Sequence, residues 1–172
     1  MKTYLKYFLF LTISFAIVAL DQATKMMIHT QFNLGEKKVI IPGFFNITYV
    51  RNTGGVFGLF SESNDVIRMI LFIILPVLAF VLILSIIHKL DIKQKYQILA
   101  FSSIFGGALG NYIDRIHFGY VVDFLDFYYK GRAWPAFNVA DMCIVIGVFS
   151  AITLIYITEE KQKKKALLLK ET

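Results

Sequence analysis

The sequence is poor in charge, cysteine and histidine, and each shortage excludes a class of protein. Only 17% of its 172 residues are charged, against 57% hydrophobic and 16% aromatic residues, a balance that soluble domains of this size do not need. The single cysteine excludes an internal disulfide and a cysteine-based zinc cluster. The histidines, His29, His88 and His117, are scattered along the chain, so we expect neither a catalytic triad nor a histidine metal site. Carboxylates remain as the candidates for chemistry.

Long apolar runs, in contrast, are abundant. Four stretches have the roughly 20 apolar residues needed to cross about 30 Å of hydrocarbon; they lie near residues 7–27, 66–87, 96–116 and 139–157. We therefore expect a single membrane domain over residues 1–172, an all-α bundle of four transmembrane helices. The first run is too long for a signal-peptide core and lacks a small-residue cleavage site, so we treat it as a span.

The basic residues predict how the chain is oriented. Ten lysines lie at the N-terminus, in the link between the second and third spans and in the tail 158–172, whereas the loops 28–65 and 117–138 hold five basic residues. Because positive charge is retained in the cytoplasm, we expect both termini there and both longer loops outside. The tail is expected to be solvated and to contact phospholipid. This distribution explains the net charge of +6 without any binding of nucleic acid.

The first outer loop, 28–65, carries strand signals. In residues 44–50, aromatic and aliphatic side chains alternate with Asn46 and Thr48, and a turn-forming RNTGG segment separates this stretch from VFGLF at residues 56–60. We expect a small antiparallel β-sheet here on the outer membrane surface. The second outer loop, 117–138, is expected to lie over the functional site.

Two aspartates lie against apolar segments on this outer side. Asp123 belongs to VVDFLDF, whose alternation predicts, if the segment is extended, that Asp123 faces the protein and Asp126 faces water, or the reverse. Asp141 follows the candidate N-cap residue Asn138 at the start of the fourth span. A carboxylate near hydrocarbon costs about 2.5–3.5 kcal/mol on insertion scales. Helix capping alone accounts for Asp141, but it does not account for Asp123 beside it.

Two carboxyl groups a few ångströms apart in a poorly hydrated site cannot both ionise cheaply, so such a pair holds one proton near neutral pH. The ionised member can take a proton from water while the protonated member polarises a peptide carbonyl, which is the chemistry of an aspartic protease. The same pair would also serve a proton or cation carrier. A carrier, however, usually needs polar groups through the membrane, and the second and fourth spans have almost none.

Further polar residues gather at the outer ends of the first and third spans. Asp21 and Lys25 lie four positions apart, on one helix face, where they either anchor the helix at the interface or support a site. The third span has small residues at four-residue steps, which favour close helix packing: Ser102, Gly106 and Gly110. Asp114 and Arg115 are adjacent, so we expect each to meet a partner on another element, in a structural ion-pair cluster or in the site.

Five segments stand out along the chain: DQATK (21–25), RNTGGVFG (51–58), GALGNYIDR (107–115), GYVVDFLD (119–126) and FNVADMCIVIG (137–147). In this order and spacing they resemble the motifs of the bacterial lipoprotein signal peptidases, also called signal peptidase II. Each segment alone is a weak signal, whereas the five together are highly specific.

The resemblance implies a membrane-embedded aspartic endopeptidase that removes the signal peptide from prolipoproteins, cleaving before the diacylglyceryl-modified cysteine at the outer face of the bacterial cytoplasmic membrane. It implies that Asp123 and Asp141 are the catalytic pair. Other matched positions bind substrate or support the site: Asn52, Gly54, Asn111, Arg115, Asn138, Asp21, Lys25 and Asp114.

The resemblance also implies that the enzyme needs no metal or cofactor and is blocked by the cyclic peptide globomycin. We expect a monomer whose partners are the lipid-modified prolipoprotein and membrane phospholipids. Because such a substrate arrives within the bilayer, the amphipathic segment 44–60 and the aromatic segment 124–134 are expected to cap the site, and their mobility to gate it.

Overall fold

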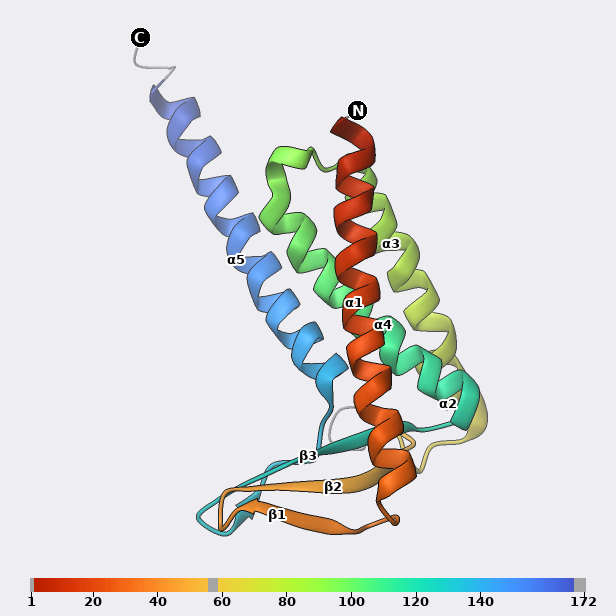
Figure 1. The fold of residues 1–172 in the computed structure, drawn as a ribbon. Coiled ribbons are helices and arrows are strands. Elements are labelled where there is room, and N and C mark those ends of the chain that lie inside the picture. The colour runs from red at the N-terminus through yellow and green to blue at the C-terminus, as the bar shows by residue number, and fades with distance from the viewer. Residues whose placement is uncertain (1, 56–58, 169–172) are drawn as a thin grey trace.

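Long helices run side by side away from a small β-sheet at one end of the molecule (Figure 1). The computed structural model describes residues 2–55 and 59–168. The helical elements are α1 (Lys2–Gln31), α2 (Asp65–Met69), the π-helical turn η2 (Ile70–Ile74), α3 (Leu75–Lys89), the 3-10 turn η3 (Ile92–Gln94), α4 (Lys95–Phe118) and α5 (Val139–Leu168). Since α2, η2 and α3 follow one another without a break, they form the second long helix.

In the described part of the chain, three helices are long and apolar enough to cross a membrane: Tyr4–Gln31, Asp65–Lys89 and Val139–Lys164. The predicted third span is α4, a helix of 24 residues that is less apolar because it buries polar side chains such as Gln97, Asn111 and Asp114. It packs against α1, α3 and α5. The prediction of a mostly helical membrane protein is confirmed. That α4 also crosses the membrane stays a prediction.

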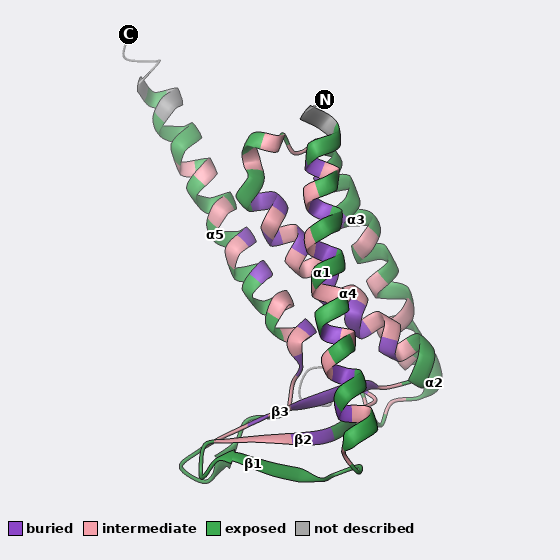
Figure 2. Cartoon of the chain, in the orientation of Figure 1, coloured by how far each residue is buried: buried purple, intermediate pink, exposed green. Residues whose placement is uncertain are grey.

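The outward faces of the other long helices carry large exposed apolar side chains, among them Phe8, Leu82 and Phe149, and exposed positions follow these faces along the bundle (Figure 2). Both ends of the described chain lie on the side of the molecule away from the sheet, and the far end of α5 is separate from that of α1 (Figure 1). The helix α5 continues through Leu168, so it includes most of the predicted tail; the tail's contact with phospholipid stays a prediction.

The sheet has four antiparallel strands in the order β1 (Lys37–Ile41), β2 (Phe45–Asn52), β3 (Val121–Tyr129) and β4 (Arg132–Ala133). The expected antiparallel sheet therefore exists, and β2 pairs with β1 on one side and with β3 on the other. Residues 59 and 60 form a turn, and residues 56–58 lie outside the described chain.

The prediction that 117–138 is a loop over the site is wrong in part, because this segment supplies β3 and β4. The pairing of Val50 with Asp123, and of Asn52 with Val121, brings the end of β2 beside the candidate carboxylate. A register shift between Ile47 and Val50 is the kind of bulge that re-aims side chains in a strand.

Asp126 does not meet water, contrary to the expectation from strand alternation. It is 4% exposed, because Lys37 on β1 and Asn46 on β2 cover it: the Lys37 Nζ lies 3.1 Å from its Oδ2, and the Asn46 Nδ2 donates to the same oxygen at 3.4 Å. Both faces of this part of β3 are thus buried, and Asp126 ties the three strands together.

The small residues of α4 allow two helices to approach closely, as predicted. A Cβ atom on Gly107 would lie 2.5 Å from the carbonyl oxygen of Ala140 on α5, and one on Gly110 would lie 2.5 Å from the Oδ2 of Asp21 on α1. Neither distance is compatible with a larger side chain. These glycines therefore set how near the start of α5 and the outer part of α1 come to α4.

The second long helix is irregular next to its only proline. Pro76 lies in the first turn of α3, directly after the π-helical turn η2, which accommodates a residue that has no N–H to donate. Phe72, within this turn, lies under the guanidinium of Arg115, whose Cζ is 4.9 Å from the ring centroid.

Candidate active site

A cavity of about 500 Å³ lies where the sheet meets α4 and the start of α5. Both predicted carboxylates, Asp123 and Asp141, line it. The other polar residues in its wall are Asn52, Asn111 and Arg115. The rest of the wall is largely apolar and includes Pro76, Tyr112, Val121, Trp134, Phe137, Met142 and Val145. The fold thus brings two acidic side chains into one mostly apolar cavity.

Asp123 lies on β3 and is 2% exposed. Its Oδ1 accepts a hydrogen bond from the Nδ2 of Asn138 at 2.7 Å, and its Oδ2 accepts one from the Nδ2 of Asn52 at 2.9 Å. The pKa of the Asp123 carboxyl is raised to about 7, chiefly by burial and also by the neighbouring Asp141 carboxylate, against the opposing effect of the two amide hydrogen bonds. The Asp123 carboxyl therefore holds its proton to higher pH than an ordinary aspartate does.

Asp141 is the third residue of α5, and Asn138 caps that helix, as predicted. The backbone N–H of Asp141 donates to the Asn138 Oδ1 at 3.0 Å, and the backbone N–H of Asn138 donates to the Asp141 Oδ2 at 3.1 Å, which is the reciprocal pattern of a capping box. The remaining oxygen, Oδ1, accepts from the Nδ2 of Asn111 at 2.8 Å. Capping and a role in the site are thus not alternatives for Asp141, because the cap holds its carboxylate at the cavity.

The orientations of the asparagine amides follow from their partners. The Nζ of Lys25, which can only donate, lies 2.8 Å from the Oδ1 of Asn111, so the Asn111 Nδ2 faces the Asp141 carboxylate, which can only accept when ionised. The Asn138 Nδ2 in turn donates to the Asn111 Oδ1 at 3.2 Å as well as to Asp123. Asn111 and Asn138 therefore join both carboxylates in one hydrogen-bond network.

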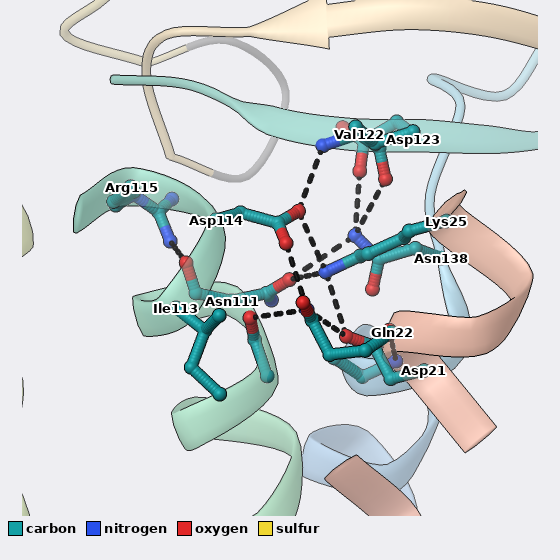
Figure 3. Close-up of polar contacts among 12 residues, drawn as sticks. Asp21, Gln22, Lys25, Asn111, Ile113, Asp114, Arg115, Val122, Asp123 and Asn138 are labelled. Carbon is teal, nitrogen blue, oxygen red and sulfur yellow. Dashed lines mark hydrogen bonds and ion pairs between the residues drawn. The ribbon is translucent and has the colours of Figure 1, made fainter. Parts of the chain in front are cut away.

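Behind the cavity, the buried ammonium of Lys25 holds two carboxylates (Figure 3). Its Nζ lies 2.8 Å from the Asp21 Oδ2 and 3.0 Å from the Asp114 Oδ2. The predicted pairing of Asp21 with Lys25 is confirmed, but its reading as a snorkelling anchor is wrong, because the two side chains are 0% and 3% exposed.

Each of these carboxylates also accepts from the backbone of a site element. The Asp21 Oδ1 accepts from the N–H of Ala140, at the start of α5, at 2.9 Å. The Asp114 Oδ2 accepts from the N–H of Val122, next to Asp123, at 3.1 Å. The ion-pair cluster therefore positions the two backbone segments that carry the candidate catalytic residues.

Arg115 holds the turn that follows β2. Its Nη2 donates to the carbonyl oxygen of Gly54 at 3.0 Å, and its Nη1 donates to the carbonyl oxygen of Asn111 at 3.2 Å. Within the turn, the N–H of Gly54 donates to the Asn52 Oδ1 at 3.0 Å, which leaves the Asn52 Nδ2 directed at Asp123. The expectation that Asp114 and Arg115 find separate partners on other elements is confirmed.

The sequence did not reveal two residues that support this arrangement. Gln22 donates to the Asp114 Oδ1 at 2.8 Å and to the carbonyl oxygen of Gly110 at 3.1 Å; its place within DQATK was the available signal. Phe72 supports the Arg115 guanidinium. Nothing in the sequence marks this role, because phenylalanine is common in apolar spans.

Comparisons with known proteins show the family to which the chain is related. The family described as Peptidase_A8, Signal peptidase (SPase) II, matches residues 13–157. A lipoprotein signal peptidase of Maridesulfovibrio salexigens is 40% identical over 151 residues, covering 88% of this chain and 97% of the relative. Another, of Desulforapulum autotrophicum, is 46% identical over 138 residues, covering 79% and 84%.

Two solved structures are also similar. A bacterial membrane enzyme determined by the in meso method at 2.3 Å resolution has a TM-score of 0.76 and 34% identity, with 91% of this chain and 90% of that chain covered. A second, at 1.9 Å resolution, has a TM-score of 0.75 and 33% identity, with 85% and 91% covered. On the family match and these relatives, the chain belongs to the signal peptidase II family of aspartic peptidases, A8.

Proposed function

We propose that Asp123 and Asp141 are the catalytic pair with which this signal peptidase II cleaves the signal peptide from prolipoproteins. The observation that carries the proposal is that two carboxyl groups line one cavity, share the hydrogen-bond partner Asn138 and differ in environment, with burial raising the pKa of Asp123 to about 7. Carboxyl groups whose environments separate their pKa values are suited to divide the acid and base roles.

In the proposed reaction, Asp141 is the base and Asp123 the acid. The Asp141 carboxylate, stabilised by the start of α5 and by Asn111, accepts a proton from a water whose oxygen attacks the peptide carbonyl carbon. Protonated Asp123 donates a hydrogen bond to the carbonyl oxygen as negative charge develops there. Collapse of the tetrahedral intermediate breaks the C–N bond, and the amine leaves with the proton that Asp141 took up. No covalent bond to the enzyme is formed.

The polar neighbours have positioning roles in this proposal. Asn52, Asn111 and Asn138 fix the two carboxyl groups, and Arg115 with Gly54 holds the turn that carries Asn52. The buried cluster contributes by fixing β3 and the start of α5, and it consists of Asp21, Lys25 and Asp114. Preorganised donors of this kind cost no reorganisation during the reaction.

The cavity suits a substrate that arrives within the bilayer. Its wall includes Trp134 near the sheet and Val145 on α5, which are 58% and 52% exposed, so the cavity reaches the surface beside an apolar helix face. We propose that the lipid-modified cysteine and the adjoining signal peptide reach the carboxylates by this lateral route. The β-sheet and the β3–β4 hairpin cap the route, and their movement gates it.

Topology and partners are part of the same proposal. All four long helices cross the bacterial cytoplasmic membrane, with both termini in the cytoplasm and the active site at the outer face. The distribution of basic residues supports this orientation, as does the position of both described ends opposite the sheet. We further propose that the protein is one membrane domain and a monomer, that it contacts phospholipids, and that globomycin inhibits it by occupying the cavity.

The test is cleavage of a purified diacylglyceryl-modified prolipoprotein, read as release of the signal peptide by gel shift. Asp123→Asn and Asp141→Asn each abolish release, whereas Asp126→Asn, which changes a buried aspartate outside the cavity on the same strand, retains it. Thermal unfolding of all three variants establishes that they fold. Normal release by either cavity variant contradicts the assignment of the pair.

A further inference from the structure

A second cavity, of about 210 Å³, lies between the start of the second long helix and the outer end of α4. Its polar lining consists of Thr53, Asp65, Arg68 and Arg115, so two guanidinium groups face a space bordered by one carboxylate. Arg115 lines this cavity as well as the active-site cavity. We call this space the Arg68 cavity.

The guanidinium of Arg68 is not satisfied by the described chain. Its Nε is buried and has no hydrogen-bond partner among the described residues. Its closest acidic neighbour, Asp65, lies 3.6 Å from the Nη1 and has a fully exposed side chain, so this pair is weak. A buried guanidinium N–H without an acceptor is costly, and the Arg68 cavity therefore favours a ligand that supplies acceptor oxygens.

Arg115, which also lines the Arg68 cavity, has further N–H donors to offer. Its two hydrogen bonds, to the carbonyl oxygens of Gly54 and Asn111, use two of the five N–H groups that a guanidinium offers. Two guanidinium groups around one small cavity match a tetrahedral anion, because their planar forks bind phosphate oxygens in pairs.

The position of the cavity indicates where such an anion comes from. Arg68 lies in the first turns of the second long helix, at the end of the bundle where the sheet lies, which is the depth of lipid headgroups when the helix spans the bilayer. Further along the same helix, away from the sheet, the side chains of Met69, Ile70 and Ile74 are about half exposed. They give acyl chains an apolar surface to lie against.

We propose that the Arg68 cavity binds a phosphate-ester anion, supplied by a phospholipid headgroup whose acyl chains lie along η2 and α3. The bound phosphate accepts from the Arg68 Nε and from free N–H groups of Arg115. It thereby connects the second long helix to the residue that holds the Asn52 turn. Inorganic phosphate has the same chemistry and is the other source that an experiment has to separate.

The experiment measures lipid retained by the purified full-length protein, using native mass spectrometry after equilibration with phosphatidylglycerol in detergent. The wild type retains one phosphatidylglycerol, and Arg68→Gln weakens this retention about ten-fold, the loss of one charged hydrogen-bonding group, or about 1.4 kcal/mol. Arg132→Gln removes the same charge from an exposed position on β4 and leaves retention unchanged. Arg68→Lys keeps the charge but not the planar fork, so we expect it to retain an intermediate amount of phosphatidylglycerol. It is the second variant to be measured if Arg68→Gln does not fold.

Two further arms identify the source. Diacylglycerol with the same acyl chains lacks phosphate, so its retention does not depend on Arg68. Inorganic phosphate, added to lipid-free protein and followed by ³¹P NMR line broadening, binds in an Arg68-dependent way only when the free anion is a source. The proposal is overturned when neither phosphatidylglycerol nor inorganic phosphate depends on Arg68, or when diacylglycerol depends on it equally.

Discussion

Lys25 and Asn111, which are 86 positions apart in the chain, meet through a 2.8 Å hydrogen bond from the Lys25 Nζ to the Asn111 Oδ1. This contact decides which end of the Asn111 amide faces Asp141, and so links an ion pair buried behind the site to the orientation of a candidate catalytic carboxylate. We therefore expect the supporting cluster to affect catalysis as well as stability.

We expect Lys25→Met to lower both the rate of cleavage and the stability of the protein. Removing the ammonium leaves Asp21 and Asp114 buried without their cation, which costs about 3–5 kcal/mol in comparable buried pairs, and it frees Asn111 to turn its oxygen toward Asp141. Thermal unfolding and signal-peptide release measure the two effects. Lys38→Met, at an exposed strand position, serves as the control, and equal behaviour of the two variants contradicts a role for the cluster.

The stability of the protein should depend on pH through Asp123. The pKa of this carboxyl rises from 3.8 to about 7 on folding, so between these values the folded protein binds a proton that the unfolded chain has released. The free energy of unfolding therefore falls as pH rises from about 4 to about 7 and is level above that. The total decrease in the free energy of unfolding is at most about 4 kcal/mol, because the pKa differs by about three units between the folded and unfolded states.

The comparison that isolates this effect is the difference in unfolding temperature between the wild type and Asp123→Asn. The asparagine does not titrate. The unfolding temperature of Asp123→Asn should therefore rise relative to that of the wild type as pH rises to about 7. Asp126→Asn provides the matched comparison on the same strand. A difference that does not vary with pH over this range contradicts the raised pKa.

Cleavage should fall in alkaline solution. Protonated Asp123 is the proposed acid, and with its pKa at about 7, kcat/KM should decline about ten-fold per pH unit above neutrality. Initial rates of signal-peptide release from pH 5 to 9 measure the profile, and Asp126→Asn should retain it. A rate that still increases at pH 9 contradicts Asp123 as the acid.

The approach of α5 to α4 should tolerate no added methyl group at Gly107. The Cβ of an alanine there would meet the carbonyl oxygen of Ala140, one residue before Asp141, so the start of α5 has to shift. We expect Gly107→Ala to lower the free energy of unfolding by about 1–3 kcal/mol and to lower kcat. Val81→Ile, which adds a methyl group at an exposed position of α3, is the control, and full activity of Gly107→Ala would show that α5 adapts.

The four long helices and the gathering of polar residues could be predicted, because apolar runs of membrane length and charged side chains beside them are local features of the sequence. Asp123 and Asp141 are each next to such a run, and Asn138 has the position of a helix cap. These features need no knowledge of distant contacts.

The pairing of the strands could not be predicted in the same way. Residues 44–50 have the alternation of a strand, but nothing local indicates that their partner begins at Val121, about 70 positions later. The burial of Asp126 depends on this pairing, because Lys37 covers it from β1. Phe72 was missed for a similar reason, since its role follows only from the position of Arg115 in space.

The hydrogen bond from Ala140 to Asp21 spans 119 positions of the chain, and one of the two carboxylates lies on the last helix. During synthesis, a nascent chain that stops before α5 contains the ion-pair cluster and Asp123 but not Asp141. Because the proposed catalytic pair is incomplete without Asp141, we expect a chain that has not yet been extended through the start of α5 to cleave no precursor.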